Sequence, residues 1–339
     1  MRSSTIRWWR ISGHSRILGI LALGGKPKRG HCMQLGRIRH GRRRRLVTVV
    51  AGVALLLGTS TITATADPVW PGGPEVPGIS APDLPKPGPA SPAPTTSSEQ
   101  PLGRANFSTP TLDPADGETV GVAQPVVISF QAAIDDKEAA EKAIRVTATP
   151  AVAGNLYWVG NKELRWKPTE FWPANTQVSV QAGSATSNFT IGESWIATAD
   201  DNTHTITVAV DGKVVRTMPT SMGANDHPTP NGIYTVGERF ADMYMDSSTY
   251  GVPVDSPDGY RTYVEYATRI SNSGIFVHAA PWSVGQQGNT NVSHGCLNVS
   301  TEDGRWFFEN APKGAPVVVV NTIGGTADPA DGLTDFTTP

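Results

Sequence analysis

The amino-acid sequence predicts a mainly β protein, in which a β-sandwich is followed by a second β-rich module with one or two short helices. From 108 to 191, segments of alternating apolar and polar residues recur about every ten residues, which is typical of a sandwich. Beyond 193, two alternating runs flank Asp211-Gly212, a pair that favours a tight β-hairpin. A stretch at 67–101 holds 11 of the 28 prolines and separates these modules from the N-terminal region.

The first module, 108–191, is predicted to contain six short strands, one helix and a core rich in aromatic residues. The strands are expected at 125–130, 144–148, 156–159, 164–166, 177–180 and 187–191, and the helix at 135–142. Trp158, Trp166 and Trp172 are expected to pack in the core or between modules, because burying their rings removes a large apolar area from water. The module contains neither histidine nor cysteine, so we expect no catalytic site in it.

The second module, 193–322, is predicted to begin with the hairpin at 205–217 and to end with a strand at 316–320. A helix is expected at 300–310, with Ser300 as its N-cap. Residues 245–260 are rich in Gly, Pro, Ser and Asp, which predicts a long loop of the kind that serves as a lid or binding loop. The segment 323–339 is predicted to be a flexible tail.

The first 66 residues are predicted to be a signal region, so the protein is expected to be exported to the cell wall or periplasmic space. An arginine cluster at 37–45 precedes an apolar core at 46–57, and Ala64-Thr65-Ala66 offers a cleavage site. Met33 would begin a signal peptide of ordinary length at 33–66. An uncleaved anchor is the alternative, since 46–66 is uncharged and long enough to span a bilayer. Attachment to the membrane is expected only in that case.

The charges are divided unevenly along the chain. Residues 1–66 carry 13 Lys and Arg and no acidic residue, which leaves 15 basic and 30 acidic residues beyond them. An acidic protein of this kind is not expected to bind nucleic acid, whose phosphates require a basic surface. Residues 67–107 are predicted to form an extended, disordered, proline-rich linker.

Cys296 would be the single thiol after signal cleavage, because Cys32 lies in the signal region. Exported proteins commonly use cysteines in disulfide pairs, so a lone thiol is either buried for structure or used in chemistry. His278 and His294 precede it within one 19-residue segment. A nearby imidazole activates a thiol by lowering its pKa or accepting its proton. Gly295 permits the close backbone approach that an oxyanion hole needs.

Two other uses of this cysteine would need residues that the sequence does not place nearby. A zinc site formed by His278, His294 and Cys296 would lack a fourth local ligand, and the spacing of the last two is awkward for one tetrahedral ion. A papain-like arrangement needs a histidine after the cysteine, and none follows Cys296. We therefore predict a nucleophilic cysteine, and keep the metal and structural roles as alternatives.

The segment around the cysteine resembles the signature of the L,D-transpeptidases, whose catalytic domain is YkuD-like. The resemblance consists of His278, then 14 residues, then the run SHGCLN at 293–298. The run 228–234 also resembles a feature of these domains. The resemblance covers about 193–322, and 108–191 looks like the Ig-like domain that precedes the catalytic domain in some members. The fold it implies is an Ig-like β-sandwich followed by an L,D-transpeptidase catalytic domain with a lid loop.

The resemblance also implies a reaction between peptidoglycan stem peptides. Cys296 would attack the carbonyl of the third residue of a tetrapeptide stem, release D-Ala and form a thioester, which an amine of a second stem would then attack to give a 3→3 cross-link. His278 would be the base, oriented by the backbone carbonyl of Ala279. The backbone N–H groups of Gly295 and Cys296 would form the oxyanion hole. No metal and no cofactor are implied, and carbapenem-type β-lactams would acylate the same thiol.

The resemblance implies that the remaining site residues shape or line the pocket, and core positions for Tyr260 and Met245 are kept as the alternative. These site residues are His294 beside the thiol, Ser293 and Asn298 as holders of the loop, Tyr260 and Met245 on the lid, and Trp282 as a packing residue or at the edge of the cleft.

Two alternative functions are kept. A sortase-like transpeptidase would use His227, Cys296 and Arg305, although the threonine that sortases place before the cysteine is missing. A non-catalytic wall-binding module built on the Ig-like fold is the other. Under the main hypothesis, His227 is a turn residue, Arg305 is a charge on the helix surface, and His204 is a structural residue in a strand.

Overall fold

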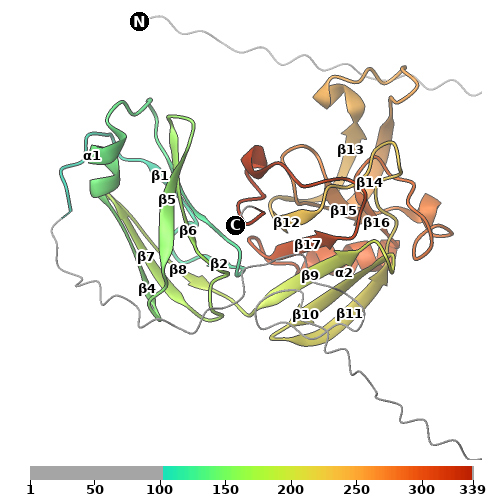
Figure 1. Cartoon of the computed structure of the whole chain (residues 1–339), viewed down its shortest axis with the longest axis horizontal. Helices are drawn as coiled ribbons and strands as arrows, with labels where there is room; N and C mark the ends of the chain where they lie inside the picture. Colours follow the sequence, from blue (N-terminus) through green and yellow to red (C-terminus); the bar gives the residue numbers. More distant parts are fainter. Residues whose placement is uncertain (1–101, 338–339) are drawn as a thin grey trace, which may run out of the picture. The chain divides into compact units, whose positions relative to one another are not determined.

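The structure is a computed structural model that describes residues 102–337 (Figure 1). The predicted signal region and residues 67–101 of the predicted linker lie outside the described residues. Within 102–337, no helix is both long enough and apolar enough to cross a membrane.

Two four-stranded sheets form the first module. One has the order β1-β3-β6-β5, with β1 at Thr111–Asp113, β3 at Val126–Ser129, β6 at Glu163–Pro168 and β5 at Gly154–Val159. The other has the order β2-β8-β7-β4, with β2 at Thr119–Val120, β8 at Ala185–Ile191, β7 at Gln177–Ala182 and β4 at Ile144–Thr149. All six predicted strands are present, and β1 and β2 are additional.

The alternation of side chains explains which face of each sheet is buried. In β7, every second residue is buried and those between are exposed, so one face of the strand points into the core. Trp166 and Trp172 are buried there, with ring centroids 5.0 Å apart, and Trp158 stacks on Phe130 at 5.6 Å. The predicted packing role of the three tryptophans is confirmed. The helix α1 (Lys137–Lys142) is also present, and the Asp136 side chain caps it by accepting from Ala139 N–H.

The second module contains a five-stranded sheet of order β11-β10-β9-β17-β12. These strands are β9 (Trp195–Asp200), β10 (Thr205–Val210), β11 (Lys213–Pro219), β12 (Gly232–Thr235) and β17 (Pro316–Val320). The run of four valines in β17 is buried on both faces. Val317 and Val319 enter the core of the second module, and Val318 and Val320 pack with core residues of the first.

The predicted hairpin between β10 and β11 is confirmed. Asp211 has φ 48° and Gly212 has φ 74°, so both central residues of the turn lie in the left-handed region. That combination is the signature of a type I′ turn, whose twist matches that of paired strands.

A four-stranded sheet of order β13-β14-β15-β16 carries the segment that contains the cysteine. Its strands are β13 (Arg239–Asp246), β14 (Arg261–Arg269), β15 (Phe276–Ala279) and β16 (Leu297–Val299). The first three pair antiparallel, whereas β15 and β16 run parallel. Parallel neighbours need a crossover connection, and residues 280–296, including the short 3₁₀ helix η2 (Pro281–Ser283), provide it.

The helix α2 (Thr301–Asn310) packs directly on β15. Its predicted N-cap is confirmed, because the Ser300 hydroxyl accepts from Asp303 N–H at 3.1 Å. Gly304 makes the close approach possible, since a Cβ at this position would lie 2.8 Å from the backbone nitrogen of Ala279. The backbone next to His278 is therefore supported from behind by a helix.

The predicted loop at 245–260 is shorter and more regular than its composition indicates. The strand β13 continues to Asp246, the 3₁₀ helix η1 follows at Ser247–Tyr250, and β14 begins at Arg261. The base of the loop is closed by Ser247 N–H donating to the carbonyl of Tyr260 at 3.0 Å. Residues 245–260 thus form the tip of a hairpin (Figure 1).

The prediction of a flexible tail at 323–339 is wrong for residues 323–337. A short 3₁₀ helix, η3 (Pro329–Asp331), lies within it, and Thr334 and Asp335 are buried. Leu333 accepts at its carbonyl from Thr235 N–H of β12 at 2.7 Å. The composition resembles that of a frayed end, but two of its three aspartates, Asp331 and Asp335, have distant partners, which local sequence cannot show.

Candidate active site

The parallel pairing of β15 and β16 places His278 and Cys296 on the same face of the sheet. His278 is the register partner of Asn298, and continuing the ladder by one residue beyond β16 sets Cys296 beside Phe276. Side chains alternate along each strand, so Phe276, His278, Cys296 and Asn298 share one face. Accordingly, Cys296 and Phe276 belong to one apolar cluster, whereas Val277, Leu297 and Val299 belong to another.

This register sets the Cα atoms of His278 and Cys296 close together on that face. Strands lie about 4.8 Å apart and rise about 3.3 Å per residue, so the two Cα atoms are separated by roughly 8 Å along the diagonal. Both side chains are nearly buried, with His278 3% and Cys296 8% exposed. The pairing on which the predicted chemistry depends is therefore compatible with the fold.

The His278 ring is held by the backbone. Its Nδ1 lies 2.9 Å from the carbonyl oxygen of Ala279, which can only accept, so Nδ1 carries the proton and Nε2 presents a lone pair. This is the orientation predicted for Ala279. Burial lowers the pKa of His278 to about 4, although the hydrogen bond to Ala279 acts in the opposite direction. At neutral pH the imidazole is uncharged and can accept a proton.

The Cys296 thiol lies against the backbone of the turn before β15. Its Sγ donates to the carbonyl of Gly274 at 3.7 Å, and Met245 and Phe276 are in the same apolar cluster. Burial raises the pKa of the thiol to about 11, with a backbone hydrogen bond to Phe276 opposing that rise. The resting pair is thus a neutral thiol and a neutral imidazole, so thiol activation requires proton transfer to His278 during attack.

This charge state predicts an unusually flat pH profile. The imidazole becomes protonated only as pH falls towards 4, and the thiol ionises only as pH rises towards 11, so the reactive neutral pair persists between them. We expect the rate constant for acylation of Cys296 to change little between about pH 6 and 9 and to fall below that range. Rates measured with a β-lactam across pH, together with thiolate absorbance at 240 nm, check this. A strong thiolate signal at pH 7 would contradict it.

Ser293 holds the loop that carries the thiol. Its hydroxyl donates to the carbonyl of Cys296 at 2.6 Å and accepts from Gly295 N–H at 3.1 Å. Gly295 has φ 112°, which only glycine adopts readily. The predicted loop-holding role of Ser293 fits these contacts. The Gly295 N–H, predicted to be an oxyanion donor, is instead engaged by Ser293 in this state.

Thr229 was not singled out from the sequence, although it lies in the 228–234 run. It is 1% exposed; its hydroxyl donates to the carbonyl of Gly295 at 2.9 Å and accepts from Gly223 N–H at 3.0 Å. It therefore ties the 228–234 run to the cysteine loop. Nothing local to Thr229 distinguishes it from a surface threonine in a proline-rich turn.

His294 stands in a row of three rings. The ring of His227 stacks on it at 4.7 Å between centroids, and the ring of Tyr260 lies 5.1 Å away on a tilted plane. His294 and Tyr260, each predicted separately as a pocket residue, are thus brought together by the hairpin tip. His227 was predicted to be a simple turn residue, but it packs in this row.

The other predicted residues lie at different depths. Met245 is buried in the apolar cluster of Cys296. Asn298 is buried; its amide donates to the Ser283 hydroxyl at 3.3 Å, and its Oδ1 has no hydrogen-bond partner within 102–337. Trp282 is 54% exposed, with its ring 6.1 Å from that of His278. Trp282 is therefore not a core packing residue, and the alternative prediction for it, a position near the edge of the site, agrees with this placement.

The structure also bears on the alternative hypotheses. Arg305 lies on the exposed face of α2, where it forms an ion pair with Glu309 at 2.8 Å, as predicted for a surface charge. A sortase-like role for Arg305 is disfavoured by this partner. His204 has φ 49° and lies in the turn before β10, 3.3 Å from Asp201, so its predicted place within a strand is wrong. Among residues 102–337, no group of three or more His, Cys, Asp or Glu is placed to hold a metal ion.

Together, the fold and the site define a class: β-rich domains built around a buried cysteine and histidine, preceded by a sandwich module. Residues 194–319 match the family model described as the L,D-transpeptidase catalytic domain, and residues 91–187 match a bacterial Ig domain. The chain belongs to the L,D-transpeptidase family, and its first module is Ig-like.

Curated relatives and solved structures agree. The chain is 52% identical to L,D-transpeptidase 2 of Mycobacterium tuberculosis (strain CDC 1551 / Oshkosh) over 249 residues, which cover 69% of this chain and 61% of that relative. It is 42% identical to L,D-transpeptidase 1 of Mycobacterium tuberculosis (strain H37Rv) over 209 residues, covering 62% and 83%. A structure of LD transpeptidase LdtMt1 in complex with imipenem is similar with a TM-score of 0.60 and 40% identity, covering 65% of this chain and 100% of that one.

A second structure extends the comparison. Crystalline L,D-transpeptidase 3 from Mycobacterium tuberculosis in complex with a faropenem-derived adduct has a TM-score of 0.57 and 41% identity, covering 62% of this chain and 97% of that one.

Proposed function

We propose that this protein is an exported L,D-transpeptidase that forms 3→3 cross-links between peptidoglycan stem peptides. One observation carries the proposal: the β15–β16 register sets the buried Cys296 diagonally beside the neutral, backbone-oriented His278. A neutral base next to a neutral thiol suits attack on an uncharged peptide carbonyl, because no ion pair has to be broken first. The named relatives support the choice of reaction.

In the acylation half-reaction, the Cys296 sulfur attacks the carbonyl carbon of the third residue of a donor tetrapeptide. The thiol proton passes to Nε2 of His278, and the resulting imidazolium gives it to the departing amine of D-Ala. The C–N bond breaks and a thioester remains on Cys296. Nδ1 stays bound to the Ala279 carbonyl throughout, so the ring keeps its orientation while its charge changes.

In the second half-reaction, an amine of an acceptor stem attacks the thioester carbonyl. His278 accepts a proton from that amine, the C–S bond breaks, and the proton returns to the sulfur. The product is an amide between two third residues, and the free thiol is restored. Attack by water instead of the amine would give simple hydrolysis of the donor stem.

The predicted site residues have distinct parts in this proposal. Met245 and Tyr260 of the hairpin tip form part of the wall around the thiol and His294, and Trp282 offers an exposed ring near His278. The backbone N–H of Cys296 would donate to the developing oxyanion. That of Gly295 would contribute only if it exchanged its Ser293 partner for the substrate.

Carbapenem-type β-lactams are proposed as covalent inhibitors of this chain. The Cys296 sulfur would attack the carbonyl carbon of their strained amide. Cleavage of the C–N bond of the ring would leave an acyl-enzyme. The imipenem and faropenem-derived complexes of the relatives support this expectation. The place of action would be the cell wall, reached through the predicted signal region.

Product analysis tests the proposed function. Incubation of the protein with a purified disaccharide-tetrapeptide is expected to yield a cross-linked dimer with loss of one D-Ala, detected by mass spectrometry. Digestion of the dimer should place the new amide between two third residues. Formation of the tripeptide product alone would show that the protein is a carboxypeptidase and not a transpeptidase. The absence of any product would reject the proposal.

A further inference from the structure

The turn that precedes β15 provides the backbone surroundings of the thiol. It spans 270–275, closed by Ile270 N–H donating to the carbonyl of Ile275 at 3.0 Å and by Gly274 N–H donating to that of Ser271 at 3.2 Å. The carbonyl of Gly274 accepts from the Cys296 thiol at 3.7 Å. Any shift of this turn therefore changes the surroundings of the sulfur directly.

One side chain outside the turn binds three consecutive residues of it. The Asp331 carboxylate accepts from Asn272 N–H, Ser273 N–H and the Ser271 hydroxyl, each at 2.8 Å. The carbonyl of Asp331 accepts in addition from the Asn272 side-chain amide at 2.8 Å. Hydrogen bonds to a carboxylate are stronger than those between neutral groups, and three of them act on consecutive residues of one turn.

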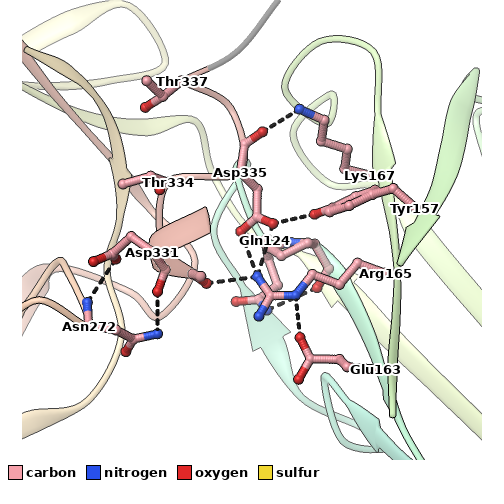
Figure 2. A network of polar contacts seen from close by, with 12 residues as sticks. Gln124, Tyr157, Glu163, Arg165, Lys167, Asn272, Asp331, Thr334, Asp335 and Thr337 are labelled. Atoms are coloured by element: carbon pink, nitrogen blue, oxygen red, sulfur yellow. Dashed lines mark hydrogen bonds and ion pairs between the residues drawn. The ribbon is translucent and has the colours of Figure 1, made fainter. Parts of the chain in front are cut away.

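The segment that carries Asp331 is itself fastened to the Ig-like module. Arg165 of β6 donates through Nη1 to both carboxylate oxygens of Asp335 at 2.9 Å and to the carbonyl of Gly332 at 2.8 Å. Tyr157 and Lys167 also bind Asp335. Figure 2 shows Asp331 turned towards Asn272, and Asp335 turned towards Arg165 and Tyr157.

This anchor is buried and charged. The side chains of Arg165 and Asp335 are 10% and 3% exposed. Removing one partner of such a pair leaves an uncompensated buried charge, which is far more costly than loss of a surface pair. The anchor therefore resists movement of the segment that carries Asp331.

We propose that Asp331 is a positioning residue for Cys296: it holds the 270–275 turn against the thiol, and the Arg165–Asp335 pair fixes the segment from which it acts. The Ig-like module thereby contributes to the alignment of the nucleophile through three linked contacts. This inference rests on the proposed role of Cys296 as nucleophile. It assigns no contact between Asp331 and substrate.

The test compares Asp331→Ala and Asp331→Asn with Asp328→Ala in the full-length protein. Asp328 is a matched control because its carboxylate caps η3 in the same segment, through Ala330 N–H at 2.9 Å, rather than the turn. Two rates are measured: acylation by imipenem, and alkylation by iodoacetamide across pH. Imipenem requires an aligned thiol, whereas iodoacetamide requires only an accessible thiolate.

We expect Asp331→Ala to slow acylation by imipenem about tenfold to a hundredfold, as misplacement of a reacting group by about 1 Å can do. Asp331→Asn, which keeps one acceptor oxygen, should fall between it and the wild type. Loosening of the turn should expose the sulfur and lower the thiol pKa obtained from alkylation, so iodoacetamide should react faster at pH 8. A purely structural role would lower Tm without moving the two rates in opposite directions.

The inference would be overturned if a folded Asp331→Asn variant reacted with imipenem and with iodoacetamide at the same rates as the wild type does, whether or not Asp331→Ala folds. Asp328→Ala slowing acylation as much as Asp331→Ala would overturn it too. Arg165→Met tests the anchor and should slow acylation in the same direction, and an unchanged rate would remove the Ig-like module from the chain of contacts. A wild-type protein without an imipenem adduct would count against the proposed function instead.

Discussion

Replacement of Cys296 by alanine is expected to abolish both the covalent adduct with imipenem and the cross-linking of tetrapeptide stems. The proposed mechanism forms every intermediate on this sulfur, and Cys32, the other cysteine of the chain, lies in the predicted signal region. The side chain is small, and alanine fills most of its buried volume, so the fold should be retained. Intact-protein mass spectrometry after incubation with imipenem measures the adduct directly.

Cys296→Ser serves as the matched control, because the hydroxyl has nearly the same shape and a much higher pKa. It should remain folded and show no adduct on the same timescale, which separates nucleophilicity from packing. Thermal unfolding of both variants should stay close to that of the wild type. An adduct that persists in Cys296→Ala would show that another residue is acylated and would remove the cysteine mechanism.

Replacement of His278 by glutamine is expected to reduce acylation by about 10³-fold at neutral pH, within the range that general-base groups contribute. Glutamine can still donate an amide N–H towards the Ala279 carbonyl, but it cannot accept the thiol proton. Because burial holds the thiol pKa near 11, few molecules carry a thiolate without the base. The rate of imipenem acylation should therefore rise steeply with pH in the variant, whereas the wild-type profile stays flat.

His227→Gln is the informative comparison for this prediction. His227 stacks on His294 and is the base that a sortase-like mechanism would require. We expect its replacement to have a much smaller effect than that of His278. If His227→Gln abolished acylation and His278→Gln left it intact, the roles of the two histidines would have to be exchanged.

Much of the fold follows from patterns that act over a few residues. Alternation within β7, positive φ values at Asp211 and Gly212, and the Ser300 cap of α2 each depend on neighbours in the chain. Those elements were predicted because the physical preference resides in the local sequence. The resemblance of the 293–298 run to one enzyme family places the cysteine in its chemical context from the sequence alone.

Other features depend on partners far away in the sequence. Trp282 has the large apolar ring that is typical of a core residue, but it lies exposed near His278. Thr229 resembles any turn threonine, yet it binds the carbonyl of Gly295 from 66 residues away. Asp335 sits in a segment typical of a frayed end, and its partner Arg165 is 170 residues distant. No local pattern contains such pairings.

The sequence by itself determined which groups are available for chemistry: one thiol beyond the predicted signal region, the nearby imidazoles, and the β-rich modules that carry them. Only the tertiary structure decided their state. The β15–β16 register set which imidazole shares a face with the sulfur, burial widened the pH range over which both groups are neutral, and the C-terminal segment closed against the turn that borders the thiol. Register, desolvation and long-range hydrogen bonds arise from chain segments that meet only after folding, which is the physical reason for this division.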